Sequence, residues 1–445
     1  MIYLLITFLS FNSLPIYSFG IIGKQASFYL ALLYVPIFLM SSFVVKNKKI
    51  SVYKNVFTIW MLLLFWVGIS YIWNIDSIRS STYLGINGVA RFVEQLIQLI
   101  FGMLLSIAIA NSVLTKRSLD KIFVVIKYSV GASIFYGLFQ YLAYSVGGIF
   151  FEANLFISGF FSETDTVLAY AQRGAGIHAF SSEPSLYAAF LLVVGPFVVI
   201  HSLECRRYIL PLLFVIALGL TGSRSGYVIG LLQALMILVL RTRGYISFSG
   251  VLKKIPAFSL VTILLSLTSF SLVVGSLLTV DEVGSNATRF AAAFAGLSAW
   301  FYEGPIFGVG LGQYGFYGLN HLPQWGLITD ETQAMAAGER WPFTHNLFIT
   351  LLSELGVVGL ALFWAVFASF FFACNRRLRE AKYLEWRVRV FGQATIVSLV
   401  GLFLTLFARE PIGNLNIWVC FGMALLFLRL SGSFEYAREY VARFE

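Results

Sequence analysis

Long apolar stretches separated by short polar loops follow one another along almost the whole chain. A helix of about 17 to 25 apolar residues spans the roughly 30 Å hydrocarbon core of a bilayer. The stretches fit this length, apart from a long fifth and a short seventh. We therefore predict about twelve transmembrane helices, near residues 2–19, 26–45, 55–74, 88–110, 122–150, 184–203, 208–221, 225–240, 256–280, 346–373, 390–408 and 412–430.

The composition leads to the same fold class. Hydrophobic side chains make up 59% of the 445 residues and charged side chains only 12%, which leaves too little polar surface to face water on all sides. No Pro- or Ser-rich linker divides the chain. We expect an all-α polytopic membrane protein in which residues 1–445 form a single transmembrane domain.

Basic residues occur mainly in alternate loops, and this pattern predicts the orientation. Cytoplasmic loops are enriched in Lys and Arg, so the net charge of +10 reflects topology rather than nucleic-acid binding. Both termini are then cytoplasmic, and the first segment, which lacks a basic leader and a small-residue cleavage site, is expected to remain as a helix. The basic loops contain Lys46, Lys48, Lys49 and Lys54; Lys116, Arg117 and Lys121; Arg206 and Arg207; Arg241, Arg243, Lys253 and Lys254; and Arg376, Arg377, Arg379, Lys382, Arg387 and Arg389.

Two outer loops are longer than a turn requires, at residues 151–183 and 281–345. Long loops in a compact protein usually carry function. The second loop joins the ninth and tenth predicted helices, and its stretch 290–301 is expected to lie as a helix at the membrane interface. The glycine-rich run GVGLGQYGFYG (308–318) follows, and it allows the backbone to approach a ligand.

His345 stands at the outer mouth of the tenth predicted helix, in FTHNLFITLLSELGVVGL (343–360). Unpaired N–H groups and the positive end of the helix dipole disfavour an imidazolium there, so the ring is expected to be neutral and able to accept a proton. That property suits a general base. The alternative is that His345 and Asn346 only cap the helix and anchor it at the interface.

Two arginines on the outer side are candidate ligands for an anion. Arg224 lies in LTGSRSGYVIG (220–230), on a tight turn between two apolar helices, and Arg289 opens the predicted interfacial stretch. A guanidinium forms forked hydrogen bonds to phosphate, and Ser223 and Ser225 are further donors beside Arg224. Two arginines suit a pyrophosphate. The alternative for each is a structural arginine whose head lies at the level of the lipid headgroups.

Other charged residues near the outer side have both structural and functional interpretations. Glu183 precedes Pro184 in HAFSSEPSLYAAF (178–190), which is an ordinary helix start, but its carboxylate would also suit an acceptor sugar or an arginine of the site. Arg91 and Glu94 are one turn apart, so we expect them to pair and to line the same cavity.

Glu354 lies nine residues after His345, about 13 Å deeper along a straight helix. That distance is too great for it to activate the histidine directly. We expect a buried structural partner for another helix, with Gly356 and Gly359 permitting close packing.

The sequence contains no pattern that indicates a cofactor. His178, His201 and His321 stand apart from one another, the three cysteines have no zinc spacing, and no Walker or dinucleotide fingerprint follows a strand. We expect no metal and no cofactor.

Several of these motifs together resemble the bacterial O-antigen polymerases and O-antigen ligases. The resemblance lies in GPIFGVGLGQYG (304–315), HNLFITLLSELGVVGL (345–360), TGSRSG (221–226) and an Arg preceding a Trp at 289–300. It implies a GT-C-like, metal-independent glycosyltransferase that acts on undecaprenyl-pyrophosphate-linked glycan at the periplasmic face of the inner membrane. It also implies that His345 is catalytic and that Arg224 and Arg289 bind the pyrophosphate. GIIGKQAS (20–27) contains no acidic residue, whereas metal-dependent GT-C enzymes commonly carry one in their first outer loop.

The activity that the resemblance favours is an inverting O-antigen polymerase, because the EPS motif at Glu183 is similar to that of polymerases. Its substrates would be undecaprenyl-pyrophosphate-linked oligosaccharide and an acceptor lipid-linked repeat unit, with a chain-length regulator as a possible partner. The alternatives are a ligase that transfers the glycan to lipid A–core, and a flippase for the same lipid-linked glycan.

Overall fold

The computed structural model describes residues 2–11, 26–44, 53–112, 116–160, 176–243, 283–380, 385–408 and 412–442. Helices account for most of these residues, and one short antiparallel pair of strands joins them. The elements are α1 (Ile2–Thr7), η1 (Phe8–Ser10), α2 (Ala26–Val44), α3 (Lys54–Trp73), α4 (Ile75–Ser80), β1 (Thr82–Tyr83), β2 (Ile86–Asn87), α5 (Gly88–Ser112), α6 (Lys116–Val146), α7 (Gly148–Ser158), α9 (Pro184–Glu204), α10 (Ile209–Leu220), α11 (Arg224–Arg243), α14 (Val283–Glu303), α15 (Tyr314–Tyr317), η3 (Gln324–Gly326), α16 (Asp330–Ala336), α17 (Leu347–Arg379), α18 (Trp386–Thr405), η5 (Leu406–Ala408) and α19 (Leu415–Ala442).

Eight helices of the described part are long and apolar enough to cross a membrane: α3, α5, α6, α9, α11, α17, α18 and α19. The all-α polytopic membrane fold is therefore confirmed. The predicted spans 26–45 and 208–221 correspond to shorter apolar helices, Ser27–Ser41 and Ile209–Leu220. The predicted span 2–19 is described only as far as residue 11, and the predicted span 256–280 lies outside the described residues.

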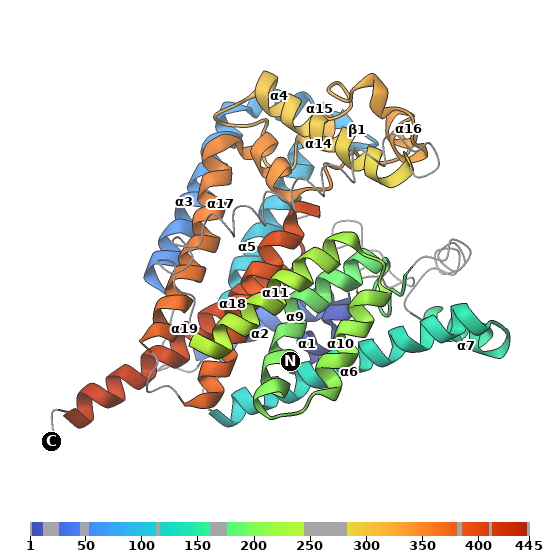
Figure 1. The fold of residues 1–445 in the computed structure, drawn as a ribbon. Helices are drawn as coiled ribbons and strands as arrows, with labels where there is room; N and C mark the ends of the chain where they lie inside the picture. The colour runs from blue at the N-terminus through green and yellow to red at the C-terminus, as the bar shows by residue number, and fades with distance from the viewer. Residues whose placement is uncertain are drawn as a thin grey trace.

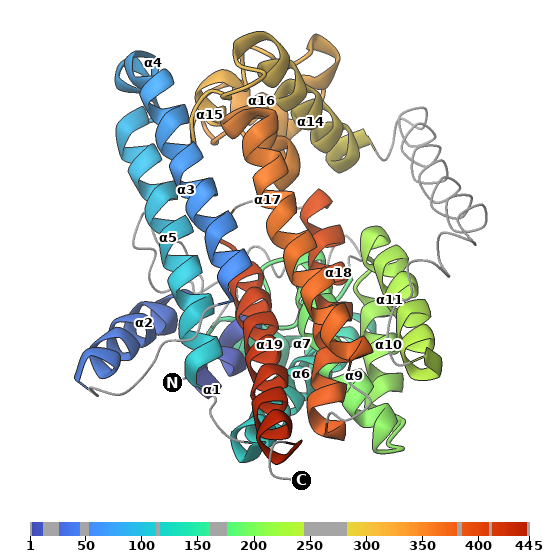
Figure 2. The ribbon, with the colours of Figure 1, turned by 90° about the vertical axis from the view of Figure 1, so that its left-hand side faces the viewer.

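The short elements gather at one end of the bundle, where α4, β1, α14, α15 and α16 form a cap (Figure 1). Figure 2 shows the bundle from a second side, with the cap at one end and the end of α19 at the other. Basic side chains near that other end join helix termini to one another. These contacts are Arg376 to the Tyr53 hydroxyl at 3.4 Å, Arg387 to Asp120 at 2.7 Å, and Arg241 to Glu204 at 3.9 Å. Loops predicted to be cytoplasmic thus meet at the end opposite the cap.

The buried core lies between α5 and α19 and between α9 and α18, the two closest pairs of helices. Small residues allow these approaches: a Cβ on Gly102 of α5 would lie 2.1 Å from the buried ring of Trp418. The buried amide of Gln233 on α11 donates to the carbonyls of Leu192 and Val397. That side chain ties α9, α11 and α18 together inside the apolar core.

Helix α17 doubles back on itself at Gly356. This residue has φ of 67° and ψ of −173°, which breaks the helix into two arms at 347–355 and 357–379. The ring of Phe348 lies 6.4 Å from that of Phe363 and 5.9 Å from that of Trp364. Residues so far apart in sequence would be separated by about 22–24 Å along a straight helix. The two arms therefore form a V, and the single straight helix expected from the sequence is wrong.

The loop 304–310 fills the apex of the V and satisfies the backbone groups that the break leaves without helical partners. Each such group needs a hydrogen bond when it is removed from water. The glycine-rich segment is thus a structural plug for the helix break. Its bonds are Val309 N–H to Ser353 O at 2.9 Å, Gly310 N–H to Glu354 O at 2.9 Å and Val357 N–H to Pro305 O at 3.1 Å, while the Trp66 indole donates to Leu355 O at 2.8 Å.

Two glycines make this close approach possible. A Cβ on Gly356 would lie 1.9 Å from the carbonyl oxygen of Ile306, and a Cβ on Gly308 would lie 2.3 Å from the backbone of Glu354. Both residues also have a positive φ that a side chain would strain. The cap is anchored to α3 at the same point, because Ser70 and Asn74 donate to the carbonyls of Phe307 and Gly308.

Gly356→Ala should destabilise the protein, because the new Cβ overlaps the Ile306 carbonyl and the backbone conformation alone costs about 1–3 kcal/mol. Thermal unfolding of purified protein in detergent measures the effect. The control is Gly68→Ala on α3, where nothing lies within 4 Å of the new Cβ. Equal melting temperatures for the two variants would contradict the plugged helix break.

Candidate functional site

His345 immediately precedes the residue that caps α17. The Asn346 side chain accepts hydrogen bonds from the N–H groups of Phe348 (3.0 Å) and Ile349 (3.2 Å), so Asn346 is the N-cap and the helix begins at Leu347. The capping role that the sequence gave jointly to the two residues belongs to Asn346. His345 itself has φ of 56°, a conformation that is uncommon for a residue with a side chain and is often found at functional sites.

Glu331 faces the imidazole of His345. One of its carboxylate oxygens lies 3.6 Å from Nε2 of the ring, and both side chains are partly exposed. Glu331 lies in the first turn of α16, where Thr329 is the N-cap and accepts a hydrogen bond from Thr332 N–H. At this distance the carboxylate is close enough to interact electrostatically with a charge on the ring.

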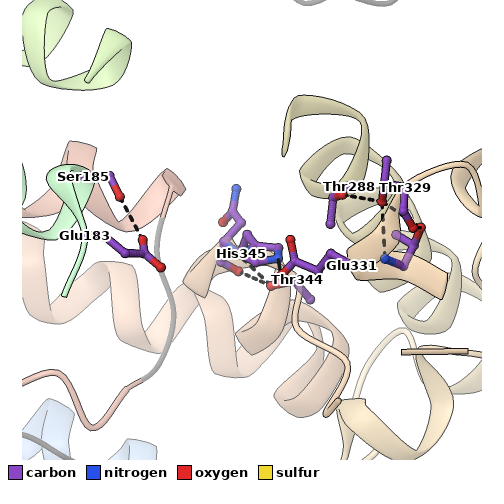
Figure 3. A network of polar contacts seen from close by, with 9 residues as sticks. Glu183, Ser185, Thr288, Thr329, Glu331, Thr344 and His345 are labelled. Carbon is purple, nitrogen blue, oxygen red and sulfur yellow. Dashed lines mark hydrogen bonds and ion pairs between the residues drawn. The ribbon is translucent and has the colours of Figure 1, made fainter. Parts of the chain in front are cut away.

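Buried threonines hold α16 against α14. The hydroxyl of Thr329 lies 2.6 Å from that of Thr288 and 2.8 Å from that of Thr332. Thr288 precedes Arg289 on α14. Thr329, the N-cap residue of the helix that carries Glu331, is therefore hydrogen-bonded to the helix that carries Arg289. Figure 3 shows this network, with Glu331 on one side of His345 and with Glu183 and Ser185 on the other.

Helix α14 also packs directly against the start of α17. A Cβ on Gly296 would lie 2.5 Å from the side chain of Ile349 and 3.0 Å from that of Thr344, which is the neighbour of His345. Arg289 lies two turns before Gly296 on the same face of α14, about 10 Å away along the helix axis. Helix α14 thus carries Arg289 and also packs, at Gly296, against the neighbour of His345.

Arg289 lines a pocket of about 270 Å³ whose other polar walls are hydroxyls. Ser223, Ser225 and Gly226 come from the first turn of α11 and the residue before it, and Ser185 comes from the first turn of α9. The positive ends of two helix dipoles thus meet a guanidinium and three hydroxyl groups. Such a combination favours an anion.

Arg224 lies between two of these serines, exposed at the first position of α11. The tight turn predicted before it is present: Gly222 has φ of 67°, and the Ser223 hydroxyl accepts from Gly226 N–H at 3.2 Å. Ile177 N–H donates to the carbonyl of Leu220 at 3.0 Å, which fastens the segment 176–183 to this turn.

Glu183 is the N-cap of α9, yet its side chain makes no capping hydrogen bond. The exposed carboxylate instead accepts a hydrogen bond from the Ser185 hydroxyl at 3.1 Å, and Ser185 lines the polar pocket. The side chain is thus held at the edge of that pocket.

Arg91 and Glu354, but not Glu94, line a second cavity. Arg91 pairs with Glu94 at 2.8 Å, as expected, and lies over the ring of Trp341 at 5.0 Å. Arg91 and Glu354 both line a cavity of about 430 Å³ beside the glycine-rich loop. Glu354 is buried, and its carboxylate accepts from the N–H of Tyr314, the first residue of α15, at 3.3 Å, so it is a structural partner of another, short helix, as expected.

The deeper position expected for Glu354 is wrong, because the first arm of α17 runs toward the apex of the V. Gly356 packs against Ile306 of the loop, and the space around Gly359 is filled by Leu355 of the same helix. Neither glycine serves the helix–helix packing that the sequence suggested.

His178 lies apart from the other histidines, as expected, and is the buried anchor of the segment 176–183. Its Nδ1 lies 2.7 Å from the carbonyl of Ser181 and its Nε2 lies 3.2 Å from the hydroxyl of Tyr144. Gln140 accepts from the N–H groups of His178 (3.2 Å) and Ala179 (2.7 Å). Burial lowers the pKa of the imidazole below its usual value, and the bond to Ser181 partly offsets this effect.

Within the described ranges, no three His, Cys, Asp or Glu side chains are placed to hold a metal ion. The metal independence expected from the sequence remains a prediction.

Residues 209–364 match the family model described as O-antigen ligase. The matched segment covers about a third of the chain. It begins with α10, includes Arg224, Arg289, Glu331 and His345, and ends on the second arm of α17. The match confirms the resemblance to O-antigen ligases and polymerases, and with the apolar helices it indicates a multi-pass membrane protein of lipopolysaccharide biosynthesis. No curated protein matches the chain.

The matched segment thus contains Arg224, Arg289 and His345, together with Glu331, which the sequence did not indicate. Glu331 lies 14 residues before His345, in a loop without periodicity. A local signal existed, because a Thr followed by two acidic residues is a common helix start. That signal predicts a helix and not a partner for His345.

The lowered pKa of His178 predicts a pH-dependent stability. The unfolded chain takes up the proton more readily than the folded one, so the contribution of His178 is present above its ordinary pKa, near 6.5, and is lost as the pH falls below it. We expect the melting temperature to fall between about pH 7.5 and about pH 5.5, and His178→Gln to have a flatter profile from a lower starting value. An unchanged slope in this variant would contradict the assignment.

Proposed function

We propose that this protein is an O-antigen polymerase, or the polymerase of a related surface polysaccharide. It would transfer undecaprenyl-pyrophosphate-linked glycan to an acceptor lipid-linked repeat unit at the periplasmic face of the inner membrane. The observation that carries the proposal is the pairing of His345 with Glu331 beside a pocket lined by Arg289 and serine hydroxyls. The family match supports ligase- or polymerase-type activity with lipid-linked glycan substrates.

The proposed reaction is an inverting displacement without a metal. An acceptor hydroxyl oxygen forms a bond to the anomeric carbon of the donor sugar, while the bond from that carbon to the pyrophosphate oxygen breaks and its electron pair leaves with the undecaprenyl pyrophosphate. The hydroxyl proton passes to His345. Arg224 and Arg289 stabilise the charge that develops on the pyrophosphate, with Ser223 and Ser225 as further donors.

Glu331 has a defined role in this scheme. Nε2 of His345 is buried and faces Glu331, so the proposed base atom is Nδ1. As the ring becomes an imidazolium, the carboxylate at 3.6 Å stabilises the new charge.

The acceptor distinguishes the polymerase from its main alternative. The EPS motif at Glu183, held at the edge of the polar pocket, favours the polymerase and places a carboxylate where it would orient an acceptor hydroxyl. The description of the matched family favours a ligase, which would use lipid A–core as the acceptor.

Variants of the His345–Glu331 pair and variants of the two arginines should differ in their effects on turnover and donor binding. His345→Ala should abolish transfer, and Glu331→Ala should lower kcat by roughly 10²–10⁴-fold as expected for general-base catalysis, both with unchanged donor affinity. Arg224→Ala and Arg289→Ala should weaken donor binding as well as turnover. Turnover and the affinity for undecaprenyl pyrophosphate are measured separately. Full activity of His345→Ala would contradict the role of His345 as the general base. Unaltered affinity for undecaprenyl pyrophosphate in both arginine variants would contradict pyrophosphate binding by Arg224 and Arg289.

Supplying purified protein with synthetic lipid-linked repeat unit as the only substrate tests the activity itself. A polymerase should form a ladder of longer glycans on the lipid, which gel electrophoresis resolves. A single transfer that requires lipid A–core would establish a ligase instead. Movement of the lipid-linked glycan across proteoliposomes without chain growth would indicate a flippase.

A further inference from the structure

An apolar groove of about 670 Å³ runs between the second arm of α17 and α18. Its walls are formed only by hydrophobic side chains, and its residues Trp364 and Ala368 are exposed. The lining residues are Trp364, Phe367, Ala368, Phe371, Leu399, Val400 and Phe403.

The groove ends beside His345. Phe348, three residues after His345, lies 5.9 Å from Trp364 and 5.0 Å from Phe403, measured between ring centroids. These are two of the residues that line the groove. Because α17 doubles back at Gly356, the start of its first arm is brought to the end of a groove formed by its second arm.

The groove and the polar pocket meet at the end of α18. Thr405 and Ala408 line the pocket that contains Arg289, while Phe403 lines the groove. Phe407 lies beside Ala408 in the chain, and its ring is 4.6 Å from Phe348 and 5.7 Å from Phe403. An anion site and an apolar groove therefore share one helix end, which is the arrangement that a lipid with a charged head requires.

We propose that this groove binds the polyprenyl chain of the donor lipid. This inference rests on the proposed function, because it takes the donor to be a polyprenyl pyrophosphate. The pyrophosphate of the donor would lie at Arg289 and the anomeric carbon of its sugar at His345. The polyprenyl chain would then follow Phe407 and Phe348 into the groove. Surrounding lipid is as apolar as the groove, so the preference comes from van der Waals contact with the aromatic walls.

Two variants change the groove without touching the polar pocket. Ala368→Trp fills it from an exposed position, and Trp364→Ala removes one aromatic wall. The matched control is Leu212→Trp, which adds a tryptophan at a position 61% exposed on α10, outside the groove. Melting temperatures establish that each variant is folded.

The readout is the affinity for undecaprenyl pyrophosphate and for geranyl pyrophosphate, which has the same head and a short chain. We expect both groove variants to lower the affinity for undecaprenyl pyrophosphate by at least about threefold, because contacts with the chain are lost. Their affinity for geranyl pyrophosphate should be unchanged. The control variant should bind both ligands as the wild-type protein does. Unchanged affinity for undecaprenyl pyrophosphate in the groove variants would overturn the proposed role of the groove, as would equal losses of affinity for the two ligands.

Failure of the proposed function would look different. In that case the wild-type protein would form no glycosyl product, or His345→Ala would retain full activity, whatever the chain-length dependence of binding.

Discussion

The break in α17 at Gly356, and the loop that closes it, is the constraint on which the rest of the structure depends. A helix that reverses inside an apolar bundle leaves N–H and C=O groups that must find partners. The loop 304–310 and the Trp66 indole supply them. Because the first arm then runs back along the second, the residues before Leu347 are placed beside Trp364 and Phe403, near the end of α18.

Chemistry is concentrated where that reversed arm begins. Helix α14 packs against it at Gly296 and carries Arg289, while α16, fixed to α14 through Thr288 and Thr329, presents Glu331 to His345. The carboxylate that faces His345 and the arginine that lines the polar pocket are therefore both held by one packed cap. Such rigidity matters in a proposed reaction without a cofactor, because positioning and fixed dipoles must then lower the barrier.

The sequence predicted several parts of this site correctly, each for a local reason. The apolar runs predicted the helices, the short gap between two of these runs predicted the turn at Arg224, and the spacing of Arg91 and Glu94 predicted their pairing. Glu354 was placed along a straight helix, because Gly356 carries no sign of the direction in which the chain turns. Glu331 was missed because its distance from His345 depends on how α16 packs on α14.

What the sequence alone determined is the membrane environment and the supply of chemical groups, since hydropathy, local turns and motif residues depend only on neighbours in the chain. The tertiary structure decided which groups meet. His345 gained a carboxylate, Arg289 gained serine and threonine hydroxyls, and an apolar groove came to lie beside Phe348 near the start of α17. These contacts join residues from separate elements, and their geometry follows from a reversal at one glycine whose cost is offset by hydrogen bonds from a loop some 50 residues earlier.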